Sequence, residues 1–358
     1  MDALPPGSTI GILGGGQLGR MLALAAARLG LDTHVYSARP VDPAAQVSTA
    51  HTPGAFDDMD ALAAFGASCD ALTYEWESIP VAAVEAAAAG RYLAPNLDAL
   101  RTAQDRLLEK RFLSGLPGVR VAPFRDASGS IHALRRAVRH VGLPCVVKTR
   151  RGGYDGKGQA VVRSEDDLIE VWEALGNFDL IVEGFVTFGR EASVVCARSR
   201  NGDVCAYPLT ENLHRDHILH TSTAPAASSA YGGDDDTPGE IARTIVDALD
   251  YVGVIGVELF DTAEGWVVNE IAPRVHNSGH WTQDAGCTDQ FEQHIRAVAG
   301  WPLGDCHPAW PVRMTNLIGH DVDDWTTLAS EPGMHLHLYG KREVRPGRKM
   351  GHVNRRIG

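Results

Sequence analysis

The fold is decided by a glycine-rich stretch between two apolar segments, VVKTRRGGYDGKGQAVV at residues 146–162. The apolar runs predict two strands, so the glycines between them form the loop of a hairpin. A phosphate-binding P-loop is excluded, because it needs Gly at position 151, Ser or Thr at position 158 and a helix afterwards. The stretch therefore predicts a strand–flap–strand unit.

A flap of this kind can fold over nucleotide phosphates, with its backbone N–H groups cradling them and Lys148 supplying a point charge. The alternative is an ordinary long β-hairpin. Against that alternative stands the cost of crowding cations among turn glycines with no anion nearby. The crowded cations are Arg150, Arg151 and Lys157.

The composition is typical of a globular protein with two or three domains. The 358 residues carry 33 Lys and Arg against 45 Asp and Glu, a formal charge of −12, and 44% are hydrophobic. These values exclude disordered and fibrous classes, and the net negative charge argues against nucleic acid and membranes as partners. The six cysteines follow no metal-binding or disulfide spacing and are expected to be reduced. With no leader pattern and no apolar run of about 18 residues, we expect a cytoplasmic protein.

The N-terminal region alternates strands and helices from Thr9 to about Pro95, which predicts a parallel sheet. Residues 14–19, GGGQLG, match a dinucleotide fingerprint between the first strand and the first helix. An NAD site is disfavoured, since residues 35–39, VYSAR, hold no acid for the ribose. A site for a phosphate or small anion at the helix start remains, with a packing turn as the alternative.

The central part of the chain is predicted to be an α+β lobe of strands joined by glycine turns, from Cys145 to about residue 272. Residues 221–239 have no apolar period and predict a mobile surface loop. Helices are predicted at about 103–114, 130–140, 165–175 and 238–251.

A second predicted hairpin brings two acids together. Residues 254–260 and 265–271 are expected strands around a turn at 261–264. Residue 264 is the midpoint of Glu258 and Glu270, so the two carboxylates become cross-strand neighbours on one face. They repel each other without a divalent cation, and oxygen ligands beside phosphates suit Mg²⁺. The alternative is a pair of solvated surface acids.

Three further segments are candidates for binding. At Glu183–Val186 a predicted strand ends, where main-chain groups can read an adenine edge, although a plain strand end also fits. The loop PRVHNSGH at 273–280 offers donors to a planar anion. The basic stretch KREVRPGRK at 341–349 predicts phosphate binding, with a solvated tail as the alternative. The histidines at 214, 217, 220, 276 and 280 lack a third metal ligand in register and are expected to form hydrogen bonds.

Six motifs occur in order along the chain. They are GGGQLGRM at 14–21, TYEWE at 73–77, QDR at 104–106, GYDGKGQ at 153–159, NEIAPRVHNSGH at 269–280 and GRKMGH at 347–352. Together they closely resemble the N(5)-carboxyaminoimidazole ribonucleotide synthetases, the PurK-type ATP-grasp enzymes of purine biosynthesis. The match spans residues 10–352, and residues 269–280 are its most specific part.

The resemblance implies an ATP-grasp fold of mixed α/β and α+β class. Its parts are a Rossmann-like parallel-sheet domain at 1–98, an ATP-grasp domain at 99–300 with a flap lobe at about 120–190, and a small C-terminal domain at 301–358. Relatives usually continue for a strand and a helix beyond the Gly-His at 351–352, so the C-terminal domain is expected to be trimmed or closed differently. Members of the family are usually homodimers.

The resemblance also implies the reaction. Members convert 5-aminoimidazole ribonucleotide, ATP and bicarbonate to the N-carboxylated ribonucleotide, ADP and phosphate through carboxyphosphate, with Mg²⁺. Bicarbonate is placed near Arg274, His276 and Asn277, and these three residues together with Tyr154, Asp155 and Lys157 form the implied catalytic set. Mg²⁺ is assigned to Glu258 and Glu270.

The resemblance assigns the remaining residues to the two larger ligands. The ribonucleotide is placed against Gln17, Leu18, Glu75, Lys341, Arg348 and Lys349, with Tyr154, Asp155 and Lys157. ATP is assigned to Arg106, Lys148, Gly153, Tyr154, Asp155, Gly156, Lys157, Gly158, Gln159, Glu183, Gly184, Phe185, Val186, Glu191, His214, Asn269 and Glu270.

Alternatives to this activity stay open at this stage. Another ATP-grasp ligase, for example one that acts on glycinamide ribonucleotide with formate, would share the ATP and Mg²⁺ residues. A non-catalytic nucleotide-binding module is expected to lack the metal carboxylates, yet Glu258 and Glu270 are both present. An oxidoreductase would need the missing ribose acid.

Overall fold

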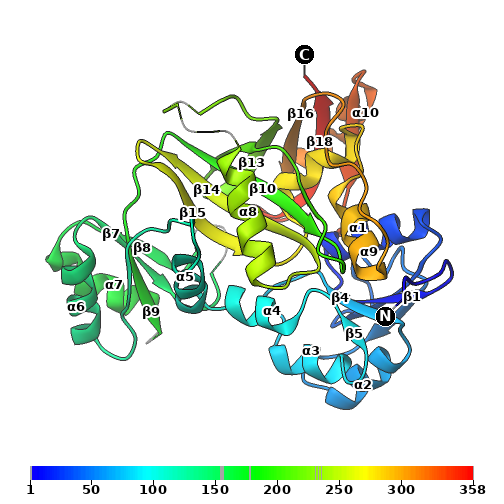
Figure 1. The fold of residues 1–358 in the computed structure, drawn as a ribbon, viewed down its shortest axis with the longest axis horizontal. Coiled ribbons are helices and arrows are strands. Elements are labelled where there is room, and N and C mark those ends of the chain that lie inside the picture. The colour runs from blue at the N-terminus through cyan, green and yellow to red at the C-terminus, as the bar shows by residue number, and fades with distance from the viewer. Residues whose placement is uncertain are drawn as a thin grey trace.

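The computed structural model describes residues 2–153, 157–176, 179–229, 231–232, 234 and 236–357. Figure 1 shows a parallel sheet built from the N-terminal residues, a smaller antiparallel sheet at the far side of the molecule and a large antiparallel sheet between them. This confirms the predicted mixture of α/β and α+β structure. Within these described ranges, no helix is long and apolar enough to cross a membrane.

The N-terminal sheet is parallel throughout, with the strand order β3-β2-β1-β4-β5. Ile10, Ile12 and Leu13 of its central strand are fully buried, as in parallel sheets covered by helices. The predicted strand–helix alternation is confirmed. The elements are β1 (Thr9–Leu13), α1 (Gln17–Arg28), β2 (Asp32–Ser37), β3 (Ala50–Pro53), α2 (Met59–Ala67), β4 (Ala71–Tyr74), α3 (Val81–Ala87) and β5 (Tyr92–Leu93).

The helix predicted at about 103–114 is α5 (Arg106–Ser114), which begins three residues later than expected, and a separate helix, α4 (Leu97–Ala103), precedes it. Asp105 separates them. Its carboxylate accepts hydrogen bonds from the backbone N–H groups of Leu107 at 3.0 Å and Leu108 at 3.4 Å, which caps the start of α5. An aspartate at this position ends one helix and begins the next because its side chain competes for the backbone donors.

The flap sheet is antiparallel, with the order β6-β9-β7-β8. Helices α6 and α7 cover it, and Leu134, Val147 and Val182 belong to the core between them. The predicted helices at 130–140 and 165–175 and the predicted strand–flap–strand unit are confirmed. The elements are β6 (Phe124–Asp126), α6 (Ile131–Val141), β7 (Cys145–Thr149), β8 (Gln159–Val162), a 3-10 helix (Glu165–Asp167), α7 (Leu168–Leu175) and β9 (Leu180–Gly184).

The central sheet has the order β15-β14-β10-β12-β13-β16-β18-β17, and β11 pairs with β10. Its C-terminal strands continue the sheet through the pairing of β13 with β16. The elements are β10 (Arg190–Arg198), β11 (Val204–Ala206), β12 (Thr210–Arg215), β13 (Ile218–Ala224), α8 (Thr237–Ala248), β14 (Gly253–Thr262), β15 (Gly265–Ala272), a 3-10 helix (Asn277–Asp284), α9 (Gln290–Ala299), β16 (Val312–Ile318), a 3-10 helix (Gly319–Asp324), α10 (Trp325–Ser330), β17 (Met334–Leu338) and β18 (Lys349–Arg356). The predicted domain limits stay predictions.

The predicted loop at 221–239 is wrong at both ends. Strand β13 extends to Ala224, because residues 221–224 pair with β16 on one side while residues 221–223 also pair with β12 on the other. Helix α8 begins at Thr237. The pairing with β16 joins segments about 90 residues apart, and no local pattern reveals such a partner.

The prediction that all six cysteines are reduced is also wrong. Cys205 in β11 and Cys306 form a disulfide bond, with their Cα atoms 6.2 Å apart. They are separated by 101 residues, so their spacing gave no local signal. Cys69, Cys145 and Cys196 are free and buried, and Cys287 is free and partly buried.

Candidate active site

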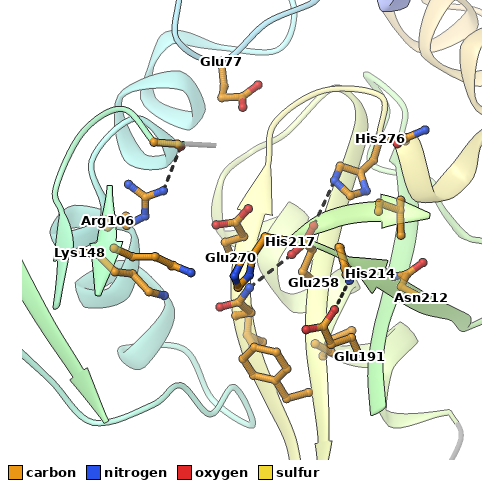
Figure 2. Close-up of a pocket in the computed structure, with 18 of the residues that line it drawn as sticks. Glu77, Arg106, Lys148, Glu191, Asn212, His214, His217, Glu258, Glu270 and His276 are labelled. Carbon is orange, nitrogen blue, oxygen red and sulfur yellow. Dashed lines mark hydrogen bonds and ion pairs between the residues drawn. The ribbon is translucent and has the colours of Figure 1, made fainter. Parts of the chain in front are cut away.

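A cavity of about 750 Å³ is lined by residues of the flap sheet and the central sheet and by the segments that follow β1 and β4. Figure 2 shows Arg106 and Lys148 on one side, Glu258 and Glu270 in the middle, and Glu191 with His214 on the other side. The predicted site residues that line it are Gln17, Leu18, Glu75, Arg106, Lys148, Gly153, Lys157, Gln159, Glu183, Gly184, Phe185, Val186, Glu191, His214, Glu258, Asn269, Glu270, Arg274, His276, Asn277 and Lys349.

Six predicted residues are not among the described residues that line this cavity. Tyr154, Asp155 and Gly156 lie outside the described residues. The carbonyl of Gly158 accepts a hydrogen bond from the backbone N–H of Thr149 at 2.8 Å, which closes the flap hairpin. The remaining two, Lys341 and Arg348, donate to the carbonyls of Lys349 at 2.5 Å and Glu343 at 3.0 Å. The roles assigned to these six residues stay predictions.

Glu258 and Glu270 stand opposite each other on β14 and β15, as predicted. The pairing arises differently from the prediction. The turn is tighter than expected, because Thr262 already pairs with Gly265. If the strands continued from this pair without a break in register, Glu258 would lie opposite Asn269. A β-bulge between Glu258 and Leu259 shifts the register by one residue and brings Glu270 into place.

The two carboxylates have opposite electrostatic surroundings. Burial raises the pKa of Glu258, but His276, His214 and Asn269 outweigh it and lower that pKa to about 2. Burial and the neighbouring Glu258 raise the pKa of Glu270. Within the described ranges, no cation forms an ion pair with Glu270. A buried carboxylate pair of this kind suits a divalent cation with oxygen ligands.

A charge cluster lies across the cavity on the flap sheet and α5. The Lys148 ammonium lies 3.0 Å from Glu183 Oε2, and the Lys110 ammonium lies 3.4 Å from the same oxygen. Burial raises the pKa of Glu183, but the two lysines outweigh it and lower that pKa to about 2. Lys110 also donates to the carbonyl of Asn269 at 2.5 Å, which ties α5 to β15. The two cations carry one more charge than Glu183 neutralises, which favours a phosphate here.

Arg106 holds the base of the flap. Its guanidinium donates to the carbonyls of Thr149 at 2.9 Å, Gly152 at 2.6 Å and Gly153 at 3.2 Å. The flap cations Arg150 and Arg151 pair with Asp105 at 2.7 Å and 3.4 Å. Asp105 therefore supplies a counter-charge for one of the two arginines within the protein, and the cost expected from crowding these cations remains for the other.

The far end of the cavity is formed by two stacked phenylalanine rings and by an ion pair between a glutamate and a histidine. Phe188 and Phe260 stack with their ring centroids 4.5 Å apart. Glu191 pairs with the His214 ring, and although burial lowers the pKa of His214, Glu191 outweighs it and raises that pKa. The backbone N–H groups of Gly184 and Phe185 already donate to carbonyls of the protein. These two donors are therefore already used within the protein, and the adenine contact expected at 183–186 stays a prediction.

The glycine fingerprint encloses a carboxylate of the protein itself. Glu75, at the end of β4, accepts hydrogen bonds from the backbone N–H groups of Gly16 at 2.6 Å and Gly19 at 2.9 Å. A Cβ atom on Gly16 would lie 2.7 Å from Glu75 Oε1, so the glycine makes room for this acid. Glu75 therefore takes two of the donors at the start of α1, and the anion site predicted there stays a prediction.

The loop after β15 carries the three residues that are predicted to bind bicarbonate. Arg274 forms a two-pronged ion pair with Glu77, with Nη2 to Oε1 at 2.9 Å and a second contact from Nε. His276 Nε2 lies 3.3 Å from Glu258 Oε1. Asn277 exchanges two hydrogen bonds with Asn316, at 3.0 Å and 2.8 Å. His276 and His280 make the hydrogen bonds expected of them, and His214 forms its ion pair with Glu191.

Sequence reasoning missed three residues that shape the cavity. Lys110 lies within a charged helix and carries no motif that marks it as buried. Glu77 belongs to the TYEWE motif, but only the structure reveals its partner Arg274. Asn212 lies in β12 and becomes important through hydrogen bonds to Ser193 and Ser222.

The family comparisons cover nearly the whole chain. Residues 8–104 match the ribonucleotide synthetase preATP-grasp domain, and residues 115–291 match the ATP-grasp domain. Residues 313–356 match the phosphoribosylaminoimidazole carboxylase C-terminal domain.

Individual relatives agree with these matches. The N5-carboxyaminoimidazole ribonucleotide synthase of Brucella melitensis is 47% identical, over 99% of this chain and 97% of its own length. The crystal structure of an ADP complex of a PurK N5-carboxyaminoimidazole ribonucleotide synthetase is 39% identical and covers 100% of this chain and 94% of its own, with a TM-score of 0.94. The Aspergillus clavatus synthase, crystallised with ADP and 5-aminoimidazole ribonucleotide, is 32% identical over 98% of this chain and 94% of its own, with a TM-score of 0.90. Identity at this level along the full length shows that the chain is a member of the PurK-type N5-carboxyaminoimidazole ribonucleotide synthase family of ATP-grasp enzymes.

Proposed function

We propose that this protein carboxylates 5-aminoimidazole ribonucleotide with bicarbonate and ATP, giving N5-carboxyaminoimidazole ribonucleotide, ADP and phosphate in purine biosynthesis. The observation that carries the proposal is the single cavity that holds both the Glu258–Glu270 pair and the Arg274–His276–Asn277 group. A phosphoryl donor and a small planar anion can meet there. The ligands named for the Aspergillus clavatus structure, ADP and the ribonucleotide, support this pairing of substrates.

The chemistry proceeds in two steps. A bicarbonate oxygen attacks the γ-phosphorus of ATP, which forms carboxyphosphate and releases ADP. The exocyclic amine of the ribonucleotide then attacks the carboxyl carbon, which forms the carbamate and releases phosphate. Lys148 offsets the charge on the transferring phosphoryl group, and Arg274 with His276 holds the bicarbonate. The flap from Gly152 to Gln159 excludes the water that would hydrolyse the anhydride.

Glu258 and Glu270 are the residues that would hold Mg²⁺. The fit rests on the raised pKa of Glu270 and on the lack of an ion-pair cation for it within the described ranges. When bound, Mg²⁺ neutralises charge on the phosphate oxygens. We expect Glu270→Gln to reduce turnover by at least about a hundredfold, because one ligand charge is lost. Near-normal ADP release by this variant at ordinary Mg²⁺ concentration would remove the metal assignment.

The test of the substrate is ADP release by the purified protein with Mg²⁺-ATP and bicarbonate, with and without 5-aminoimidazole ribonucleotide. We expect strong stimulation by the ribonucleotide. ADP release that is equal without it would contradict the substrate. Replacing bicarbonate with formate separates the rival ATP-grasp ligase, which alone would accept formate.

We also propose that the protein is a cytoplasmic homodimer, as expected from its family resemblance. Light scattering on the purified protein measures the mass directly. A mass equal to the 38.4 kDa chain would contradict the dimer.

A further inference from the structure

The main chain of His276 is clamped in place. The side-chain amide of Gln290 donates to the carbonyl of His276 at 2.7 Å and accepts from its N–H at 2.8 Å. A Cβ atom on Gly256 would lie 2.6 Å from the Cβ atom of His276, so the loop packs directly on β14. The backbone that carries the imidazole is therefore fixed, and Figure 2 shows the contact of the ring with Glu258.

One of the ring nitrogens, Nδ1, contacts the hydroxyl and the backbone N–H of Ser278. His276 Nδ1 lies 2.8 Å from Ser278 Oγ and 3.4 Å from the backbone nitrogen of Ser278. A backbone N–H can only donate, so Nδ1 acts as an acceptor with a free lone pair. In a neutral imidazole the ring proton then lies on Nε2, which is 3.3 Å from Glu258 Oε1.

A chain of buried side chains sets the direction of the bond from Ser278. The Ser222 hydroxyl donates to Asn212 Oδ1 at 2.7 Å, and Asn212 Nδ2 donates to Ser193 Oγ at 2.9 Å. Ser193 in turn donates to Ser278 Oγ at 2.6 Å. Ser278 Oγ is thus already an acceptor, so its own proton goes to His276 Nδ1. The three serines are fully buried, and Asn212 is 8% exposed, so bulk water hardly competes with this order.

We propose that Ser278 and Ser193, supported by Asn212, are positioning residues that hold His276 as the Nε2–H tautomer. This rests on the proposed function, in which His276 contacts bicarbonate. With the proton on Nε2, the ring presents a donor, which faces Glu258 Oε1 in this structure and would face an oxygen of the anion in the bicarbonate complex. With the proton on Nδ1, the ring would present a lone pair and repel the same oxygen, and it would also face the N–H of Ser278 with a second donor.

The first experiment measures the tautomer without reference to activity. The protein is labelled with ¹⁵N-histidine, and long-range ¹H–¹⁵N correlation spectra are recorded, with His276→Gln used to assign the His276 signals. We expect an unprotonated Nδ1 and a protonated Nε2 in the wild-type protein. In Ser278→Ala and Ser193→Ala, we expect the two nitrogen shifts to move toward each other as the tautomers mix.

The second experiment measures kinetics on the same variants. We expect Ser278→Ala to raise the KM for bicarbonate by about tenfold, with kcat and the KM for ATP within about twofold of the wild-type values. Ser193→Ala, one bond further away, has a smaller effect in the same direction. Ser199→Ala is the matched control, because Ser199 is also a buried serine but bonds to Asp203 outside this chain.

The spectra and the kinetics together distinguish failure of the tautomer proposal from failure of the proposed function. A protonated Nδ1 in the wild type, or unchanged shifts in both serine variants, would overturn the proposal whatever the kinetics. The expected shifts with an unchanged bicarbonate KM would overturn the role in positioning. If the wild-type protein shows no bicarbonate-dependent ADP release, the proposed function fails, and the spectra alone still decide whether the serines hold the tautomer.

Discussion

The ion pair between Arg274 and Glu77 supports a sharp prediction about Glu77→Gln. Burial raises the pKa of Glu77, but Arg274 outweighs it and lowers that pKa from 4.5 to about 2. A difference of this size corresponds to roughly 3 kcal/mol of stabilisation. The folded-state pKa is lowered, so this stabilisation is fully present above about pH 4.5 and is lost as the pH falls toward 2. The variant also leaves the partly buried Arg274 guanidinium without this counter-charge.

Urea unfolding at pH 7, followed by tryptophan fluorescence, measures the effect. We expect Glu77→Gln to reduce the free energy of unfolding by about 3 kcal/mol and to raise the KM for bicarbonate, since Arg274 loses its orientation. Glu343→Gln is the matched control, because Glu343 pairs with Arg345 in solvent. We expect no change for it. A loss below about 1 kcal/mol in Glu77→Gln would refute the reasoning, since exposed pairs already reach that value.

Three further predictions concern other parts of the molecule. Burial holds the pKa values of His280 and His352 well below 6.5, so these two histidines bind protons more readily in the unfolded chain than in the folded protein. The midpoint temperature of thermal unfolding should therefore drop between pH 7 and pH 5. A constant midpoint over this range would contradict the prediction. Gly256→Ala should cost about 1–3 kcal/mol in urea unfolding, because its Cβ would meet His276, whereas Gly239→Ala, with its nearest atom 3.9 Å away, should cost nothing. Dithiothreitol should lower the thermal midpoint by opening the Cys205–Cys306 bond, and a Cys205→Ser variant should no longer respond.

Glu258 and Glu270, the acids proposed to hold Mg²⁺, illustrate how far the sequence can predict a site. Alternating apolar residues and a short polar turn were enough to predict the hairpin and the face on which Glu258 lies. The symmetric count around residue 264 gave the right partner, Glu270, although the turn and the bulge each differ from that count. A bulge leaves no mark in hydrophobic periodicity, because it displaces the register without changing residue types.

Long-range partners set the limit of the prediction. The glycine fingerprint was correctly placed between β1 and α1, but the acid that fills it comes from residue 75, on a strand far along the chain. Lys110 and the disulfide were missed for the same reason, since each depends on a partner more than 70 residues away. The resemblance to a known family supplied most site residues, while the contacts that orient them required the fold.

The shared central sheet has a mechanical consequence. The carboxylates on β14 and β15 and Lys349 on β18 belong to one continuous set of hydrogen-bonded ladders, whereas Lys148 belongs to the separate flap sheet. A parallel bridge between Val121 and Val268 joins the segment before the flap sheet to β15. Hydrogen-bond pairing fixes the register between neighbouring strands, and therefore the distances between residues on them. The pairing therefore fixes the spacing between the two acids and Lys349, whereas the position of Lys148 depends on the contacts that join the two sheets.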